Sequence, residues 1–136
     1  MVSYTSMNDV GRVVNPTIVR GQLDGGAVQG IGQALLEDVV YDPETGQLLT
    51  GSLMDYAVPH ADIMPGLFDT HTDESIPCKT NVLGVKGVGE LGTIGATPAV
   101  VNAVADARAR HGRADLSPQL QMPLTPYRLW QLMQQG

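Results

Sequence analysis

Hydrophobic residues recur at helical spacing in three segments of the chain, and each segment begins with a similar dipeptide. Asn15-Pro16, Thr97-Pro98 and Thr125-Pro126 each place a side chain that can accept a backbone hydrogen bond directly before a proline. Proline at the first helical position loses no hydrogen bond, because the amide there has no partner within the helix, and Asn and Thr are frequent N-caps. The pattern predicts helices over residues 16–37, 98–110 and 126–134.

Between the first two helices the pattern changes to short strands and loops. Residues 38–41 and 47–50 flank the turn sequence Asp42-Pro43-Glu44-Thr45-Gly46, which is typical of a hairpin. Residues 2–8 alternate weakly between polar and hydrophobic side chains, so we expect a strand there, without an obvious partner in the chain. Residues 57–75 contain prolines and several acidic positions, and we expect them to be mostly loop.

The composition indicates one domain or a piece of a larger one. The 136 residues are 43% hydrophobic but only 4% aromatic, so a core must be formed by many small aliphatic side chains. We predict the α+β class, with three main helices packed on a mixed or antiparallel sheet. Residues 1–136 are expected to form a single partial domain.

The charge and the cysteine content exclude several classes of function. The net charge is −6, and the absence of a basic stripe argues against binding to nucleic acid. No apolar run approaches the roughly 20 residues of a membrane span, and no signal peptide is visible at the N-terminus. The single cysteine, Cys78, excludes an internal disulfide and fits a reducing compartment. We therefore expect a cytoplasmic protein without a membrane partner.

The first predicted helix contains five glycines, each of which destabilises a helix by roughly 0.8–1 kcal/mol relative to alanine. At helical spacing, Gly25, Gly26 and Gly32 gather with Gln22, Gln29 and Gln33 on one face, and a second face forms an apolar stripe that includes Ile31. Glycine lets another backbone or a flat ligand approach a helix closely. The pattern alone leaves two interpretations open: packing through small residues with solvated glutamines, or a face that binds a ligand.

A glycine-rich segment precedes the second predicted helix. Gly87-Val88-Gly89-Glu90-Leu91-Gly92 matches G-x-G-x-x-G, the dinucleotide-binding fingerprint. That motif is meaningful only when a strand precedes it and a helix begins within it. Here Pro98 is expected to delay the helix until six residues after Gly92, and no strand–helix–strand unit is expected around the motif. We therefore disfavour a dinucleotide site.

Glu90 is the candidate for chemistry within this segment, because its neighbours Val88, Leu91 and Ile94 are apolar. A carboxylate in an apolar, partly dry site has a raised pKa and can act as a general base. The alternative is a solvated loop glutamate or a cap for the following helix. The residues alone do not separate these interpretations.

These segments, in this order, resemble the molybdopterin-binding subunit of the molybdenum hydroxylases, the superfamily of xanthine dehydrogenase, aldehyde oxidase and carbon monoxide dehydrogenase. The match to the bacterial branch with carbon monoxide dehydrogenase-like large subunits is the best. Five stretches in register carry the resemblance: NDVGRVVNPTIVRGQLDGGAVQGIGQALLED, YDPETGQLLTGS, MDYAVPHADIMP, VLGVKGVGELGTIGATPAVVNAVADA and MPLTPYRLWQLM.

The resemblance implies specific roles for single residues. Glu90 matches the family's active-site glutamate beside the molybdenum, where it acts as the base. Gln22 matches a glutamine that hydrogen-bonds the pterin, which favours the ligand interpretation of the first helix. No residue of this chain is implied to ligate the metal. Further contacts to the cofactor are implied for Lys86, Gly87, Val88 and Gly89.

A complete subunit of this family is several times longer, and the resemblance covers only its C-terminal end. The complete enzyme is implied to hold a molybdenum–molybdopterin cofactor, with the cytosine dinucleotide form favoured. The implied partners are the remaining part of the molybdopterin subunit and the iron–sulfur and FAD subunits. We expect a split subunit, a truncated reading frame or an isolated domain. The isolated chain is expected to bind no cofactor, to be inactive and to form a homo-oligomer.

Two classes of function remain open on the sequence. One is a fragment or split subunit of a molybdopterin-dependent oxidoreductase that supplies Glu90 and part of the pterin surface. The other is a non-catalytic assembly module whose cofactor residues are remnants, and the substrate is not indicated in either case. The histidines at positions 60, 71 and 111 lack a metal-ligand spacing and are expected at the surface, and Cys78 is expected to be a structural thiol.

Overall fold

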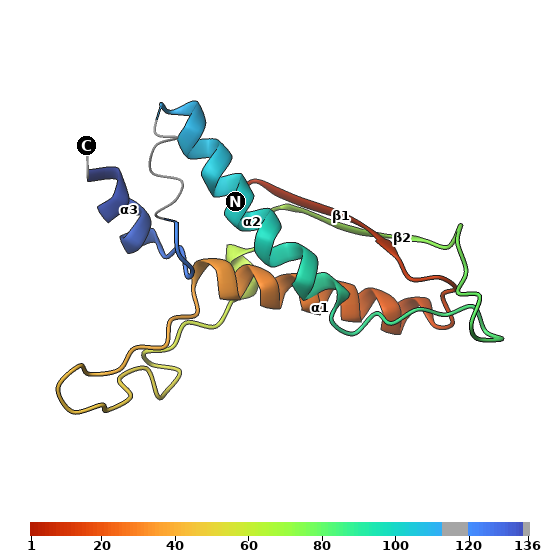
Figure 1. The fold of residues 1–136 in the computed structure, drawn as a ribbon, viewed down its shortest axis with the longest axis horizontal. Coiled ribbons are helices and arrows are strands. Elements are labelled where there is room, and N and C mark those ends of the chain that lie inside the picture. The colour runs from red at the N-terminus through yellow and green to blue at the C-terminus, as the bar shows by residue number, and fades with distance from the viewer. Residues whose placement is uncertain (113–119, 135–136) are drawn as a thin grey trace.

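The described residues form helices packed with a small two-stranded sheet, which confirms the α+β class (Figure 1). The computed structural model describes residues 1–112 and 120–134. The elements are β1 (Ser3–Asp9), α1 (Pro16–Leu35), the short 3-10 helix η1 (Ala61–Ile63), β2 (Leu67–Asp73), α2 (Leu91–Arg110) and α3 (Pro126–Gln134).

Two of the predicted helix starts are confirmed with their caps. The Asn15 side chain accepts a hydrogen bond from the amide of Ile18 at 3.1 Å, and Pro16 is the first residue of α1. The Thr125 hydroxyl accepts from the amide of Arg128 at 3.3 Å at the start of α3. A side chain that satisfies an otherwise unpaired amide fixes the residue at which each helix begins.

The predicted start of the second helix is wrong, because α2 begins at Leu91 and contains Pro98 in its interior. The Thr97 hydroxyl donates to the carbonyls of Thr93 and Gly30, at 3.1 and 3.3 Å, and caps nothing. Proline disfavours a helix interior, but the turns before it pack against α1. Contacts between distant parts of the chain therefore outweigh the local signal.

The expectations for the sheet are also corrected. Strand β1 pairs in parallel with β2, in a register that runs from Ser3 opposite Leu67 to Asp9 opposite Asp73. The strand expected at residues 2–8 therefore has a partner, residues 57–75 are not mostly loop, and the sheet is neither mixed nor antiparallel. Because α1 lies between the two strands in the chain, it serves as the long connection that parallel strands require.

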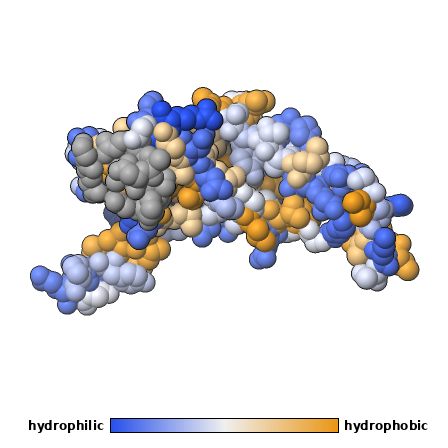
Figure 2. Space-filling view, turned by 45° about the horizontal axis from the view of Figure 1, so that its top comes forward, coloured by the Kyte–Doolittle hydropathy of each residue, from blue (hydrophilic) through white to orange (hydrophobic). Residues whose placement is uncertain are grey.

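The predicted hairpin turn is confirmed, but the strands expected at 38–41 and 47–50 are reduced to one isolated bridge. The segment forms an arm that extends from the body (Figure 1). Tyr41 and Leu48 form an antiparallel bridge, and the Asp42 carboxylate accepts from the amides of Glu44 and Thr45 in the turn. Figure 2 shows hydrophobic surface gathered where this arm joins the body. Several large hydrophobic residues of the arm are exposed: Val39, Val40, Tyr41, Leu48, Leu49, Leu53, Met54 and Val58.

The core lies between α1 and α2 and consists of small aliphatic residues, as the composition predicts. Ile31 is its large member, and Ala27, Ala34, Ala96 and Val100 surround it. One face of the two-stranded sheet covers this cluster, where the rings of Tyr4 and Phe68 stack with their centroids 5.2 Å apart. Small residues allow the two helices to approach closely, which brings their backbones into contact.

Gly92 marks the closest approach of the two helices. A Cβ atom at this position would lie 2.5 Å from the carbonyl oxygen of Leu23 and 2.7 Å from the amide nitrogen of Ala27, both in the backbone of α1. On α1, Gly26 faces Gly92 and Thr93 in the same contact, and the Thr93 hydroxyl donates to the Gly26 carbonyl at 2.9 Å. No side chain larger than hydrogen fits there.

Gly92→Ala is therefore expected to destabilise the protein, because the new methyl group must push the helices apart. Overpacking of this kind lowers the free energy of unfolding by about 1–3 kcal/mol. Gly95→Ala is the matched control: it lies on the same helix, and no heavy atom lies within 4 Å of its Cβ position. It should raise the stability by up to about 1 kcal/mol. Urea denaturation compares the three proteins, and equal midpoints for Gly92→Ala and the parent would contradict the packing.

Candidate functional site

Glu90 lies at the end of the glycine-rich loop, directly before the first residue of α2. Its backbone has φ −112° and ψ −1°, and its side chain makes no capping hydrogen bond. The side chain is exposed, so neither the helix-cap interpretation nor a site dried by this chain alone describes it. The carboxylate is open to a ligand or to another polypeptide.

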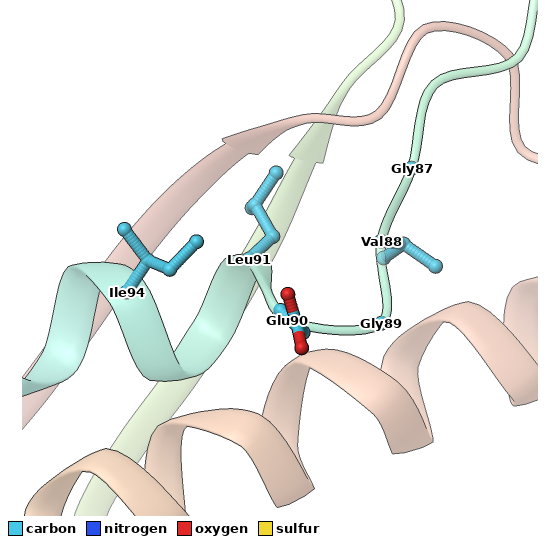
Figure 3. A pocket seen from close by; sticks show the side chains of 6 residues that line it. All are labelled: Gly87, Val88, Gly89, Glu90, Leu91 and Ile94. Atoms are coloured by element: carbon cyan, nitrogen blue, oxygen red, sulfur yellow. The ribbon is translucent and has the colours of Figure 1, made fainter.

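A concavity of about 490 Å³ surrounds this carboxylate (Figure 3). Leu91 and Ile94, at the start of α2, lie on one side of it, and the glycine loop with Val88 lies on the other (Figure 3). The segment therefore combines one carboxylate with aliphatic side chains and open backbone. The lining residues are Gly87, Val88, Gly89, Glu90, Leu91 and Ile94.

Gln22, on the exposed side of α1, lies beside this loop. A Cβ atom on Gly89 would be 3.8 Å from the Oε1 atom of Gln22. The structure thus brings together Gln22 and the segment of Glu90, which are far apart in the sequence. The close approach of α1 and α2 at Gly92, three residues after Gly89, fixes this arrangement.

The glycines of α1 divide between the two interpretations that the sequence left open. Gly26, Gly30 and Gly32 are buried and explained by packing, so the sequence placed Gly26 and Gly32 on the wrong face. Gly21 and Gly25 flank Gln22 on the exposed side, and no heavy atom lies within 4 Å of either Cβ position. Packing within the described residues does not require glycine at these two positions.

Two threonines of α2 lie beside the exposed glutamines of α1. This pairing was not predicted from the sequence. The Thr93 hydroxyl lies 3.4 Å from Oε1 of Gln29, and the Thr97 hydroxyl lies 3.4 Å from Oε1 of Gln33. Their spacing of four residues matches that of the glutamines, which could have indicated the pairing. The exposed glutamines therefore lie next to the threonines of the neighbouring helix, whose hydroxyl hydrogens already go to backbone carbonyls.

Lys86 does not line the concavity, because its ammonium group forms an ion pair with Asp9 at 2.5 Å. Asp9 also accepts a hydrogen bond from the amide of Gly11 at 3.1 Å. Gly11 has φ +64°, and a Cβ atom there would lie 2.3 Å from the carbonyl oxygen of Gly84. We call these four residues, Asp9, Gly11, Gly84 and Lys86, the loop anchor.

Backbone hydrogen bonds complete the loop anchor. The amide of Lys86 donates to the carbonyl of Val10, and the amide of Arg12 donates to the carbonyl of Gly84, both at 3.0 Å. The segment that follows β1 and leads into α1 is therefore tied to the start of the glycine loop. Asp9 and Gly11 were not predicted from the sequence, although an Asp side chain commonly accepts a hydrogen bond from the amide two residues later in a turn.

The remaining candidates lie apart from this site. His60, His71 and His111 are exposed as expected, and Nε2 of His71 lies 2.9 Å from Asp69. Cys78 is half-buried, and its contact with the Thr80 hydroxyl lowers the pKa of the thiol. Within residues 1–112 and 120–134, no three His, Cys, Asp or Glu residues cluster as metal ligands, and no helix could cross a membrane.

The G-x-G-x-x-G match lies in a different setting from the one expected. The helix begins inside the motif, at Leu91, so the expected delay of the helix by Pro98 is wrong. The β1–α1–β2 unit precedes the motif, and in the described part of the chain no strand follows α2, so no strand–helix–strand unit surrounds the motif, as expected. Strand β2 ends at Asp73, well before Gly87, and the motif therefore does not follow a strand directly. A dinucleotide fingerprint requires that strand–turn–helix continuity.

Comparisons with known proteins are consistent and cover nearly the whole chain. Residues 1–65 match the family described as a molybdopterin cofactor-binding domain. The chain is 39% identical over 130 residues to the 6-hydroxypseudooxynicotine dehydrogenase complex subunit gamma of Paenarthrobacter nicotinovorans, covering 96% of this chain and 16% of that protein. It is 44% identical over 121 residues to the nicotine 6-hydroxylase large subunit of the same organism, covering 89% and 14%.

Solved structures give the same result. Quinoline 2-oxidoreductase from Pseudomonas putida 86 superposes with a TM-score of 0.85 and 38% identity, over 98% of this chain and 16% of that chain. A Cu,Mo-CO dehydrogenase superposes with the same TM-score and 34% identity, again over 98% and 16%. The fold and the site thus define part of a molybdopterin-binding subunit. The chain belongs to the molybdenum hydroxylase family, as the resemblance implied, and spans about 16% of the length of several of these relatives.

The loop anchor predicts a dependence of stability on pH. The hydrogen bond from Lys86, followed by that from the Gly11 amide, lowers the pKa of Asp9. A carboxyl with a lowered folded-state pKa stabilises the protein above its unfolded pKa of about 3.9, and this stabilisation is lost as the pH falls through the folded value. Asp9→Asn should therefore lower the urea midpoint at pH 7, and the difference from the parent should shrink below about pH 4.

Asp62→Asn serves as the control, because Asp62 is exposed on η1 and lies outside the loop anchor. It should change the midpoint little at pH 7. A difference between Asp9→Asn and the parent that stays constant from pH 7 to pH 3 would show that the ion pair is not its origin.

Proposed function

We propose that this chain supplies the catalytic base and one wall of the pterin site to a molybdenum-dependent oxidoreductase. One observation carries the proposal: Gln22, on α1, lies beside the loop that ends in Glu90, although the two are far apart in the sequence. The membership in the molybdenum hydroxylase family supports the assignment of these two residues. Residues 1–136 are then one partial domain of a larger assembly.

The residues fit a flat, hydrogen-bonding cofactor. Gln22 offers an exposed amide, which can donate and accept at the edge of a pterin. Space is open beside it, because no heavy atom lies within 4 Å of the Cβ positions of Gly21, Gly25 and Gly87. When bound, the molybdenum–molybdopterin group supplies two-electron redox chemistry, and we propose the cytosine dinucleotide form.

Each site residue has a distinct part in this proposal. Gln22 binds the pterin, while the backbone of Gly87, Val88 and Gly89 lies against the cofactor. Lys86 acts indirectly, since its ion pair with Asp9 holds the start of the loop. The Glu90 carboxylate accepts a proton during the reaction, and the rest of the subunit excludes water around it.

The names of the relatives support a substrate class and a set of partners. Nicotine 6-hydroxylase and quinoline 2-oxidoreductase are both named for compounds with an aromatic nitrogen ring. We propose a substrate of that class for the complete enzyme. The proposed partners are the remaining part of the molybdopterin subunit and the iron–sulfur and FAD subunits, in the cytoplasm. Alone, the chain should self-associate through the exposed hydrophobic residues of its arm.

A complemented complex makes the proposal testable. It consists of the nicotine 6-hydroxylase large subunit without the stretch that matches this chain, its companion subunits, and this chain supplied separately in a host that makes molybdopterin. The same truncated subunit with its own excised stretch is the positive control. Assembly without activity would favour the non-catalytic alternative.

Glu90→Gln tests the base in this complex. Glutamine keeps the shape of the side chain but cannot accept the proton, so reduction of the complex by nicotine should slow by about 10²–10⁴-fold. Molybdenum content should not change, because Glu90 is exposed and makes no capping bond. Glu44→Gln, on the exposed arm, is the control. Reduction of Glu90→Gln at the parental rate would remove the catalytic assignment.

Gln22→Ala tests the pterin wall. Loss of a hydrogen bond of about 0.5–1.5 kcal/mol should weaken pterin binding by roughly 2–10-fold. Molybdenum and pterin content should therefore fall at limiting cofactor, while the loaded fraction keeps most of its rate per molybdenum. Gln47→Ala, in the arm, should keep full occupancy. If Gln22→Ala loads like the parent, Gln22 has no part in binding the pterin.

A further inference from the structure

The concavity beside Glu90 has an apolar side that packing among residues 1–112 and 120–134 does not explain. Val88 and Leu91 are half-buried, and the Ile94 side chain remains 70% exposed. Among the six lining residues, Glu90 is the one that carries a charge. Isolated exposed hydrophobic residues are common, but apolar side chains grouped around one carboxylate in a hollow are typical of small-molecule sites.

The first turns of α2 present two different faces. Gly92 and Ala96 point toward α1 and are buried in the contact between the helices. Leu91 and Ile94, three residues apart, extend together to another side (Figure 3). Because these two side chains are excluded from the contact between the helices, they are available to a ligand.

The backbone fixes Ile94 relative to the carboxylate. Its amide donates to the carbonyl of Glu90 at 3.1 Å, in the first helical turn. A side chain held in this way keeps a constant distance from the catalytic group. Gly95 follows it with no heavy atom within 4 Å of its Cβ position, so the space next to Ile94 is open.

The volume and the chemistry of the concavity together indicate its ligand. About 490 Å³ lies within the usual range of small-molecule sites, roughly 300–1,000 Å³. Aliphatic side chains bind the face of an uncharged ring by removing apolar surface from water, and they reject a charged group that would lose its hydration. The open glycine backbone on the opposite side leaves room for a planar molecule.

We propose that Leu91 and Ile94 determine substrate specificity by forming an apolar wall that holds an uncharged ring beside Glu90. This inference rests on the proposed function and adds the part of the site that selects the substrate. A change in the wall alters how well the ring is bound, whereas a change in Glu90 alters the rate of the reaction. Substitutions in the wall should therefore change mainly KM, and substitutions of Glu90 should change mainly kcat.

The test compares Ile94→Ser with Ile18→Ser in the complemented complex, with nicotine as the substrate. Ile18 is a matched control, because it is 62% exposed on α1 and does not line the concavity. Ile94→Ser should raise KM for nicotine about tenfold and change kcat little, as expected for the loss of an apolar contact. Ile94→Leu should restore the parental KM, and Ile18→Ser should keep it.

The outcomes distinguish this inference from the proposed function. A loaded parental complex that nicotine does not reduce overturns both. Turnover by the parent with an unchanged KM for Ile94→Ser overturns the wall and leaves the function standing. If Ile94→Ser instead reduces the amount of chain that co-purifies, with KM unchanged, the wall is a contact between polypeptides and the inference is wrong.

A second measurement uses the full chain without the cofactor. In methyl-labelled protein, added quinoline should shift the methyl resonances of Ile94 and Leu91 and leave that of Ile18 in place. Because the apolar wall and not the carboxylate binds the ring, quinoline should shift the same methyl resonances of Ile94 and Leu91 in the Glu90→Gln variant. Equal shifts at Ile94 and Ile18 would mean that the ring binds without selection, and would contradict the wall.

Discussion

The contact between the backbones of α1 and α2 determines the geometry of the candidate site. Gly26 and Gly92 allow the two helices to approach until a single methyl group would collide with the opposite backbone. The core around Ile31 holds the helices together on one side of this contact. A site formed by two helices in this way is only as well defined as their separation, since a shift of one helix moves every group that it carries.

The functional residues depend on that contact in complementary ways. Gln22 lies on the exposed side of α1, and Glu90 ends the loop that leads into α2, so the helix pair sets their relative positions. The loop anchor adds a second constraint, because Asp9 and Lys86 tie the start of the glycine loop to the segment between β1 and α1. Together they hold an irregular segment, which glycine would otherwise leave free to move, in one place.

The sequence predicted the local features of the fold and missed those that depend on distant contacts. Asn15 and Thr125 are local caps, and the helices that they begin were placed correctly. Strand β2 has polar residues on both faces, and its pairing with β1 is not visible in its pattern. For α2, the signal of Pro98 was misleading, because packing on α1 stabilises the turns before it. Resemblance to a family indicated Gln22 and Glu90, but not that Gln22 lies beside the loop that ends in Glu90.

The most direct test of the whole account is the molybdenum content of the complemented complex. If this chain provides one wall of the pterin site, the truncated subunit without the chain should contain almost no molybdenum, and addition of the chain should restore it to nearly the level reached with the relative's own stretch. A complex that assembles fully with this chain but contains no molybdenum, while the positive control is loaded, would contradict the proposal.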